Sequence, residues 1–183
     1  MTEKKWGSTQ TRRHALLAGK YLLYAGLVLL CYILQNTPGF LEIFGVKPFL
    51  VIPAVLAIAM FEGEFVGALY GAFGGMLCDL AANTFYGFYT LTLFLACAAV
   101  GLGVIYLMKN DYKTAFLTAV CYLGAMTLVE YLFYYLLYGY PGNWRVLVFQ
   151  LLPRMACTSA LTPLFWLGER ALYERFERLT GTI

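Results

Sequence analysis

Long apolar runs separated by short polar breaks dominate the chain from residue 16 onward. Several of the runs approach or exceed 20 residues, which is enough for a helix to cross the ~30 Å hydrocarbon core of a bilayer. The pattern predicts an all-α integral membrane protein, a bundle of six transmembrane helices. The expected helices cover residues 16–34, 48–61, 65–82, 88–107, 114–138 and 146–167.

These helices suggest three parts of the chain. We expect a basic cytoplasmic arm at 1–15, a six-helix transmembrane domain at 16–168, and a charged cytoplasmic C-terminal helix or tail at 169–183. The second expected helix opens with Pro48, contains Pro53 and is short, about 20 Å at 1.5 Å per residue. It is therefore expected to begin inside the loop or to thin the membrane locally.

One apolar run carries a ladder of small residues. Gly67, Gly71 and Gly75 recur every four residues, and Asp79 is the next step of the series. Residues four apart lie on one face of a helix, where glycines allow another helix backbone to approach closely. We expect this helix to be central to the bundle. Its glycine face either packs within the bundle or receives a helix of another protein.

Three ionisable residues, Asp79, Glu130 and Arg154, lie inside apolar runs. A charge there is costly unless it faces protein, a partner or water. Counting about 1.5 Å per residue places all three in the outer half of the membrane. We expect Arg154 to pair with one or both carboxylates; alternatively, Glu130 snorkels and Arg154 reaches outer headgroups. This buried ion cluster would serve as a structural clasp, a partner contact or a ligand site.

Composition supports the membrane assignment, and the basic residues orient the chain. Only 13% of residues are charged, about half the ~25% of soluble domains. The basic ends indicate membrane lipid as a contact, not nucleic acid. Basic residues are rarer on the side opposite the termini, which holds only Lys47 and Arg145, so both termini are expected in the cytoplasm. The other side holds Lys4, Lys5, Arg12, Arg13, Lys20, Lys109, Lys113, Arg170, Arg175 and Arg178.

Motifs for catalysis or metal binding are absent from the sequence. His14, the one histidine, lies in the basic arm, and Asp79 follows Leu77-Cys78 where intramembrane aspartyl proteases have Gly-x-Gly. The five cysteines lie in apolar runs and form no CxxC pair, which is typical of small packing residues. We therefore expect no enzyme activity, catalytic residue, cofactor or metal.

A set of local motifs accompanies the hydropathy pattern. They are Pro48 and Pro53, Phe61-Glu62-Gly63, the glycine ladder with Asp79, the turn Phe85-Tyr86-Gly87-Phe88, Glu130 among tyrosines, and Leu152-Pro153. With six expected spans and a basic N-terminus, the chain resembles the MreD family of bacterial rod shape-determining proteins over nearly its whole length.

The resemblance implies a non-enzymatic inner-membrane scaffold of the cell-elongation complex, which couples peptidoglycan synthesis to cell shape. It implies MreC as a partner, together with the RodA glycosyltransferase, a class B penicillin-binding protein and, indirectly, MreB filaments. It also implies an architecture like that of the S-components of energy-coupling-factor vitamin transporters. The alternative function is therefore that of the substrate-binding S-component of such a transporter. In the alternative, the small-residue face would dock the coupling subunit and the outer ion cluster would bind vitamin.

Overall fold

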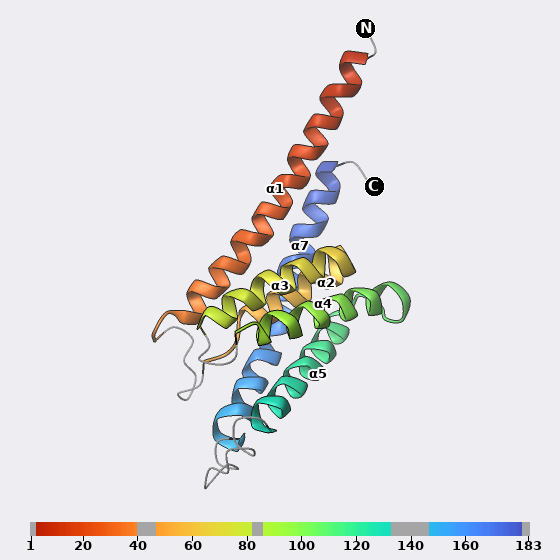
Figure 1. Ribbon diagram of the computed structural model, residues 1–183. Helices are drawn as coiled ribbons and strands as arrows, with labels where there is room; N and C mark the ends of the chain where they lie inside the picture. The colour runs from red at the N-terminus through yellow and green to blue at the C-terminus, as the bar shows by residue number, and fades with distance from the viewer. Residues whose placement is uncertain (1–2, 40–46, 82–85, 133–146, 181–183) are drawn as a thin grey trace.

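The structure, a computed structural model, describes residues 3–39, 47–81, 86–132 and 147–180, and this part is helical (Figure 1). The all-α class is confirmed. In chain order the elements are α1 (Glu3–Asn36), α2 (Val51–Glu62), α3 (Glu64–Ala81), α4 (Phe88–Tyr106), α5 (Tyr112–Glu130), the short π-helix η2 (Leu147–Leu151) and α7 (Leu152–Thr180).

Three of the described helices are long and apolar enough to cross a membrane: the Leu16–Asn36 part of α1, α4 and α5. The described residues therefore do not form a clear bundle of six spans. α2 has 12 residues, about 18 Å of helix, which is well short of the ~30 Å core. The prediction of a short second helix agrees with this length.

The centre of the molecule is α2, not the glycine-rich α3 as predicted. Every residue from Val51 to Met60 is buried, and α2 contacts α1, α3, α4, α5 and α7. A helix that is apolar on all sides is typical of a core position. α3 lies beside it and contacts α1, α2 and α4.

Side chains from α1 and α7 accept the N–H groups just before and at the first residue of α2. The Gln35 side-chain oxygen, from α1, accepts the backbone N–H groups of Leu50 at 2.9 Å and Val51 at 3.3 Å. The Thr158 hydroxyl oxygen, from α7, accepts the N–H of Phe49 at 3.0 Å. Because the first turn of a helix lacks internal acceptors, these bonds hold α2 between α1 and α7.

The two terminal helices extend beyond the expected spans. α1 begins at Glu3, so the basic arm and the first apolar run form one helix, and α7 continues through the charged segment to Thr180. A change from apolar to polar residues does not by itself interrupt backbone hydrogen bonds, which explains both extensions. The N-terminal end of α1 and the C-terminal end of α7 lie at the same end of the molecule (Figure 1).

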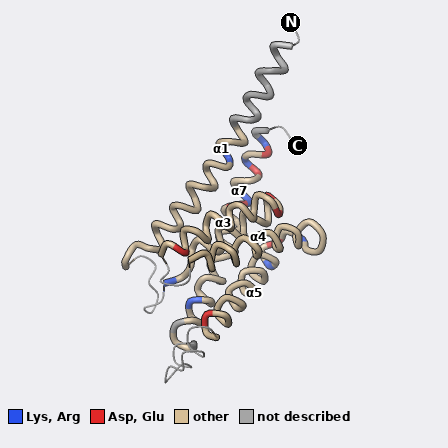
Figure 2. Tube along the Cα trace, in the orientation of Figure 1, with Lys and Arg blue, Asp and Glu red and all other residues tan. Residues whose placement is uncertain are grey.

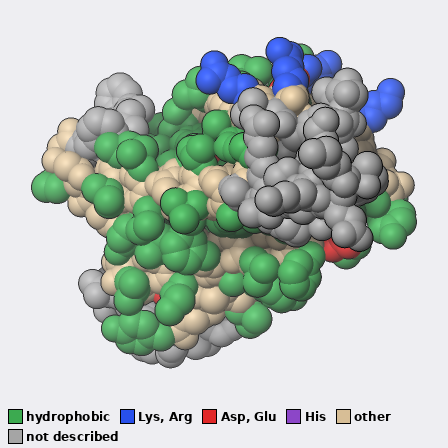
Figure 3. Space-filling view, turned by 90° about the horizontal axis from the view of Figure 1, so that it is seen from above, with side chains coloured by type: hydrophobic (Ala, Val, Ile, Leu, Met, Phe, Trp, Pro, Cys, Tyr) green, Lys and Arg blue, Asp and Glu red, His purple; other side chains and the backbone are tan. Residues whose placement is uncertain are grey.

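Large hydrophobic side chains point outward from the long helices. Hydrophobic groups cover much of the surface seen from above, with Lys and Arg gathered along one edge (Figure 3). Leu22 of α1, Phe65 of α3, Leu95 of α4 and Leu128 of α5 are among the exposed ones. Exposed apolar surface on this scale is typical of a protein surrounded by lipid.

Candidate functional site

Gly67, Gly71 and Gly75 lie where α3 approaches its neighbours most closely. A Cβ atom added to Gly67 would lie 2.5 Å from the Cβ of Ala59 on α2. One added to Gly71 would lie 2.6 Å from the carbonyl oxygen of Leu93 on α4. Contacts this short leave no room for a methyl group, so the glycines permit the backbones to touch.

The same close packing continues at both ends of the α3–α4 contact. A Cβ atom on Gly75 would lie 2.5 Å from the Cα of Thr90, at the start of α4. Gly101, near the end of α4, is equally tight, with Glu64 nitrogen 2.5 Å from the added atom. Gly101 belongs to no four-residue ladder, so the sequence pattern does not mark it as a close contact. Gly67, Gly71 and Gly75 form a strip along α3, here called the glycine strip. In this structure, α2 and α4 of the same chain cover it.

Asp79 is buried and caps the start of α4. Its Oδ1 accepts the backbone N–H of Tyr89 at 2.9 Å. Its Oδ2 accepts the backbone N–H of Thr90 at 2.9 Å and the Thr90 hydroxyl at 2.5 Å. The N-cap position of α4 is Gly87, which has no side chain to do this. A carboxylate at a helix N-terminus is favoured by the free N–H groups and the helix dipole.

Tyr89 connects Asp79 to Glu130. Its backbone N–H donates to Asp79, and its hydroxyl donates to Glu130 Oε1 of α5. The side chain is buried, and its ring centre lies 6.0 Å from that of Phe49. Two of the three predicted cluster residues are thus joined through Tyr89, which was not among the residues predicted for the cluster. The aromatic turn just before it was the one available signal.

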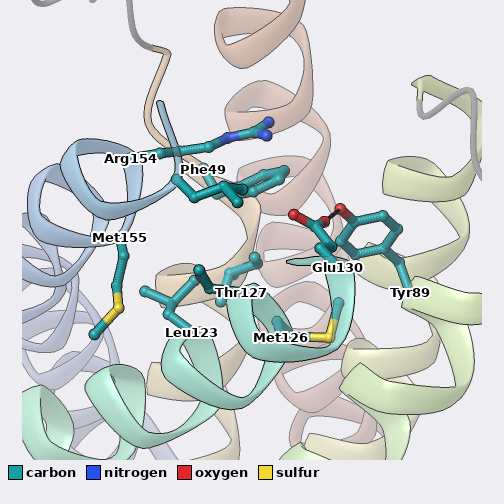
Figure 4. A pocket seen from close by; sticks show the side chains of 10 residues that line it. Phe49, Tyr89, Leu123, Met126, Thr127, Glu130, Arg154 and Met155 are labelled. Carbon is teal, nitrogen blue, oxygen red and sulfur yellow. Dashed lines mark hydrogen bonds between the residues drawn. The ribbon is translucent and has the colours of Figure 1, made fainter. Parts of the chain in front are cut away.

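Arg154 does not form the expected ion pair. Among the residues that the structure describes, no ion pair joins it to Asp79 or Glu130. Its guanidinium carbon lies 3.6 Å from the centre of the Phe49 ring, a cation–π contact (Figure 4). Its Nε is buried and has no hydrogen-bond partner within this part of the chain. Both carboxylates instead accept bonds from the α4 residues described above.

A small cavity separates Arg154 from Glu130. Phe49, Tyr89 and Thr127 line it together with these two residues (Figure 4). Its volume is about 20 Å³, enough for about one water molecule. Pockets for drug-sized ligands measure ~300–1,000 Å³. As it stands in this structure, this cavity therefore does not accommodate a vitamin.

A second polar cluster, the inner cluster, consists of Lys20, Tyr24, Glu62, Glu169 and Tyr173. The Lys20 ammonium of α1 pairs with Glu62 Oε1 of α2, and both side chains are less than a tenth exposed. The Tyr24 hydroxyl donates to the same oxygen at 2.9 Å. Lys20 Nζ also lies 4.5 Å from the centre of the Tyr173 ring.

Glu169 of α7 is the anomalous member of the inner cluster. It is only 1% exposed, and neither carboxylate oxygen has a hydrogen-bond partner among the described residues. Burial raises the pKa of Glu169 to about 8; the charge of Glu62 acts in the same direction and that of Lys20 opposes it. The sequence pattern does not indicate this cluster, because Lys20 lies in the first expected helix, Glu62 in the Phe61-Glu62-Gly63 motif and Glu169 in the expected C-terminal tail.

The polar break between α4 and α5 is also tied to the core. The Asn110 amide donates to the carbonyl oxygen of Met60 at 3.0 Å. The Trp166 indole N–H donates to the Asn110 side-chain oxygen at 2.8 Å. One asparagine therefore links this break to the end of α2 and to α7.

In the described part of the chain, no group of His, Cys, Asp and Glu residues could hold a metal ion.

Comparison with known proteins gives one match. A family model described as rod shape-determining protein MreD matches residues 17–176, which include the glycine strip and both polar clusters. No curated protein and no solved structure matches the chain.

Proposed function

The chain belongs to the MreD family of rod shape-determining proteins, and we propose that it is a non-enzymatic scaffold of the bacterial cell-elongation complex. The observation that carries this proposal is the extent of the family match, residues 17–176. In this role the protein couples peptidoglycan synthesis to cell shape. Its proposed partners are MreC, RodA and a class B penicillin-binding protein, with MreB acting indirectly.

The proposed location is the inner membrane, crossed six times with both termini in the cytoplasm. Three long apolar helices support a multi-pass protein. The ends of α1 and α7 lie at one end of the molecule (Figure 1), and α7 carries Arg170, Arg175 and Arg178 toward that end (Figure 2). Basic residues on one side favour the cytoplasm for that side. The S-component-like architecture stays a prediction.

The glycine strip is proposed to act inside this bundle. Because α2 and α4 occupy it, a partner helix would have to displace one of them to bind there. We assign to Gly67, Gly71 and Gly75 the role of holding three helices at a fixed distance. A rigid bundle can then present its outer apolar faces to partner helices.

The outer polar residues are proposed to hold helices together as a clasp. They are Asp79, Tyr89, Glu130 and Arg154. Asp79 fixes α4 to α3, and Tyr89 fixes α4 to Glu130 of α5. Arg154 of α7 lies across the small cavity from Glu130, so α7 also borders this cluster. Polar contacts between helices stabilise membrane bundles, where water cannot replace them. The transporter alternative is supported by no observation of comparable weight.

The test is cell shape in the native bacterium. Depletion of the protein should convert rods to rounded cells, and the wild-type chain should restore rods. Gly103→Ala should also restore them, because nothing lies within 4 Å of an added Cβ there. Gly71→Leu should not. Unchanged cell width after depletion would contradict the proposal.

A further inference from the structure

The inner cluster holds two carboxylates and one ammonium group. Lys20 is bonded to Glu62, which also accepts the Tyr24 hydroxyl. Glu169 is almost fully buried and has no donor among the described residues. An ionised carboxylate without a hydrogen bond or counter-ion in such a place is strongly disfavoured. The geometry therefore requires one more positive charge, or a neutral Glu169.

The helices around Glu169 contribute titratable or charged side chains. α1 supplies Lys20, Tyr24 and, farther along, Cys31, and α2 supplies Glu62. α3 supplies Tyr70, and α7 itself supplies Tyr173 one turn away. The near end of α5 has Tyr112 and Lys113, with Tyr112 packed against Trp166 and Lys113 over the Tyr112 ring. Among the side chains that the structure describes in the inner cluster, Lys20 is thus the one cation, and it is already paired with Glu62.

We propose that Glu169 is a proton-binding site, and that its protonated form is the one that leaves Lys20 bonded to Glu62. The carboxylic acid exchanges its proton with cytoplasmic water. When the proton leaves, the carboxylate of Glu169 competes with Glu62 for the single ammonium group. Because Lys20 belongs to α1, Glu62 to α2 and Glu169 to α7, proton release shifts α1 from α2 toward α7.

The raised pKa of Glu169, about 8, agrees with a proton held at neutral pH. A glutamate that binds its proton more tightly in the folded than in the unfolded state stabilises the fold at low pH. This contribution is complete below the ordinary value of 4.5 and declines as pH rises toward about 8. Above that pH both states are deprotonated and the contribution stays constant.

The test is infrared spectroscopy of the purified full chain in detergent at neutral pH. A protonated carboxylic acid gives a carbonyl band that a carboxylate lacks. We expect such a band in the wild type, its disappearance as pH is raised past about 8, and its loss in Glu169→Gln. The matched control is Glu174→Gln, because Glu174 lies on the same helix, has a side chain that is 45% exposed, and pairs with Arg170. The Glu174→Gln variant should show the same carbonyl band as the wild type.

A wild-type band that Glu169→Gln leaves intact, or no band at neutral pH, would overturn the proposal. If Glu169→Gln does not fold, Glu169→Asp keeps an acid at the site with a shorter side chain. The band should then shift in frequency and titrate at a different pH. A spectrum and titration identical to those of the wild type would also overturn the proposal.

Discussion

Asp79 and Tyr89 join two consecutive helices: the Asp79 Oδ1 atom lies 2.9 Å from the backbone nitrogen of Tyr89 and accepts its hydrogen. The carboxylate of α3 therefore does the capping that Gly87, at the N-cap of α4, cannot do. This relationship gives Asp79 a structural role that requires no counter-ion.

Replacement of Asp79 by alanine should destabilise the fold by about 1–2 kcal/mol, because the first N–H groups of α4 lose their acceptor. Asp79→Asn should lose less, since its amide oxygen still accepts. The measurement is reversible unfolding in detergent. Asp111→Ala is the matched control, because Asp111 is the N-cap of α5 and its side chain makes no capping bond. Equal losses in the two alanine variants would contradict the capping role.

Gly71→Ala should destabilise the α3–α4 contact by about 1–3 kcal/mol, since the added methyl would overlap Leu93 oxygen at 2.6 Å. The control is Gly103→Ala on α4, where the added atom meets open space. That change should be neutral or stabilise the helix by about 0.5–1 kcal/mol. Thermal unfolding of both variants decides the matter, and a stable Gly71→Ala variant would show that the backbones are not in contact.

Arg154 should be coupled to Phe49 and not to Asp79. A double-mutant cycle of Arg154→Ala and Phe49→Leu should give a coupling energy of about 0.5–2 kcal/mol from the lost cation–π contact. Arg154→Ala and Asp79→Ala should be additive within about 0.5 kcal/mol. The charge swap Asp79→Arg with Arg154→Asp should rescue nothing. Rescue by the swap would instead establish the direct ion pair predicted from the sequence.

Lys20→Met should be among the most damaging single changes in the inner cluster. It would leave the buried Glu62 carboxylate without its counter-ion, which typically costs about 3–5 kcal/mol. Adding Glu62→Gln to this variant should restore part of the loss. Lys113→Met is the control, because Lys113 is exposed and makes no ion pair within the described residues. Comparable losses for Lys20 and Lys113 would contradict a buried pair.

The helices themselves could be predicted from the sequence. Hydropathy placed α3 and α4 within one or two residues of their bounds, at Glu64–Ala81 and Phe88–Tyr106. The spacing of Gly67, Gly71 and Gly75 indicated one close-packed face, because the helical repeat alone puts them together. Helix starts depended on longer-range contacts. Val51, not Pro48, begins α2 because Gln35 of α1 binds the N–H groups of Leu50 and Val51.

The polar contacts could not be predicted in the same way. Lys20 and Glu169 are 149 positions apart, and nothing local marks them as neighbours in one cluster. Asp79 was expected to pair with Arg154, but its carboxylate instead accepts backbone N–H groups ten and eleven residues along the chain. A sequence shows which side chains need partners in a membrane. The packing of the helices decides which partners they find.

The most direct test of the scaffold role is co-purification. The tagged protein should be isolated from native membranes in a gentle detergent, with untagged membranes as the control, and its companions identified by mass spectrometry. We predict recovery of MreC together with RodA or a class B penicillin-binding protein. Recovery of ATP-binding-cassette subunits and a coupling membrane protein would contradict the account and support the transporter alternative.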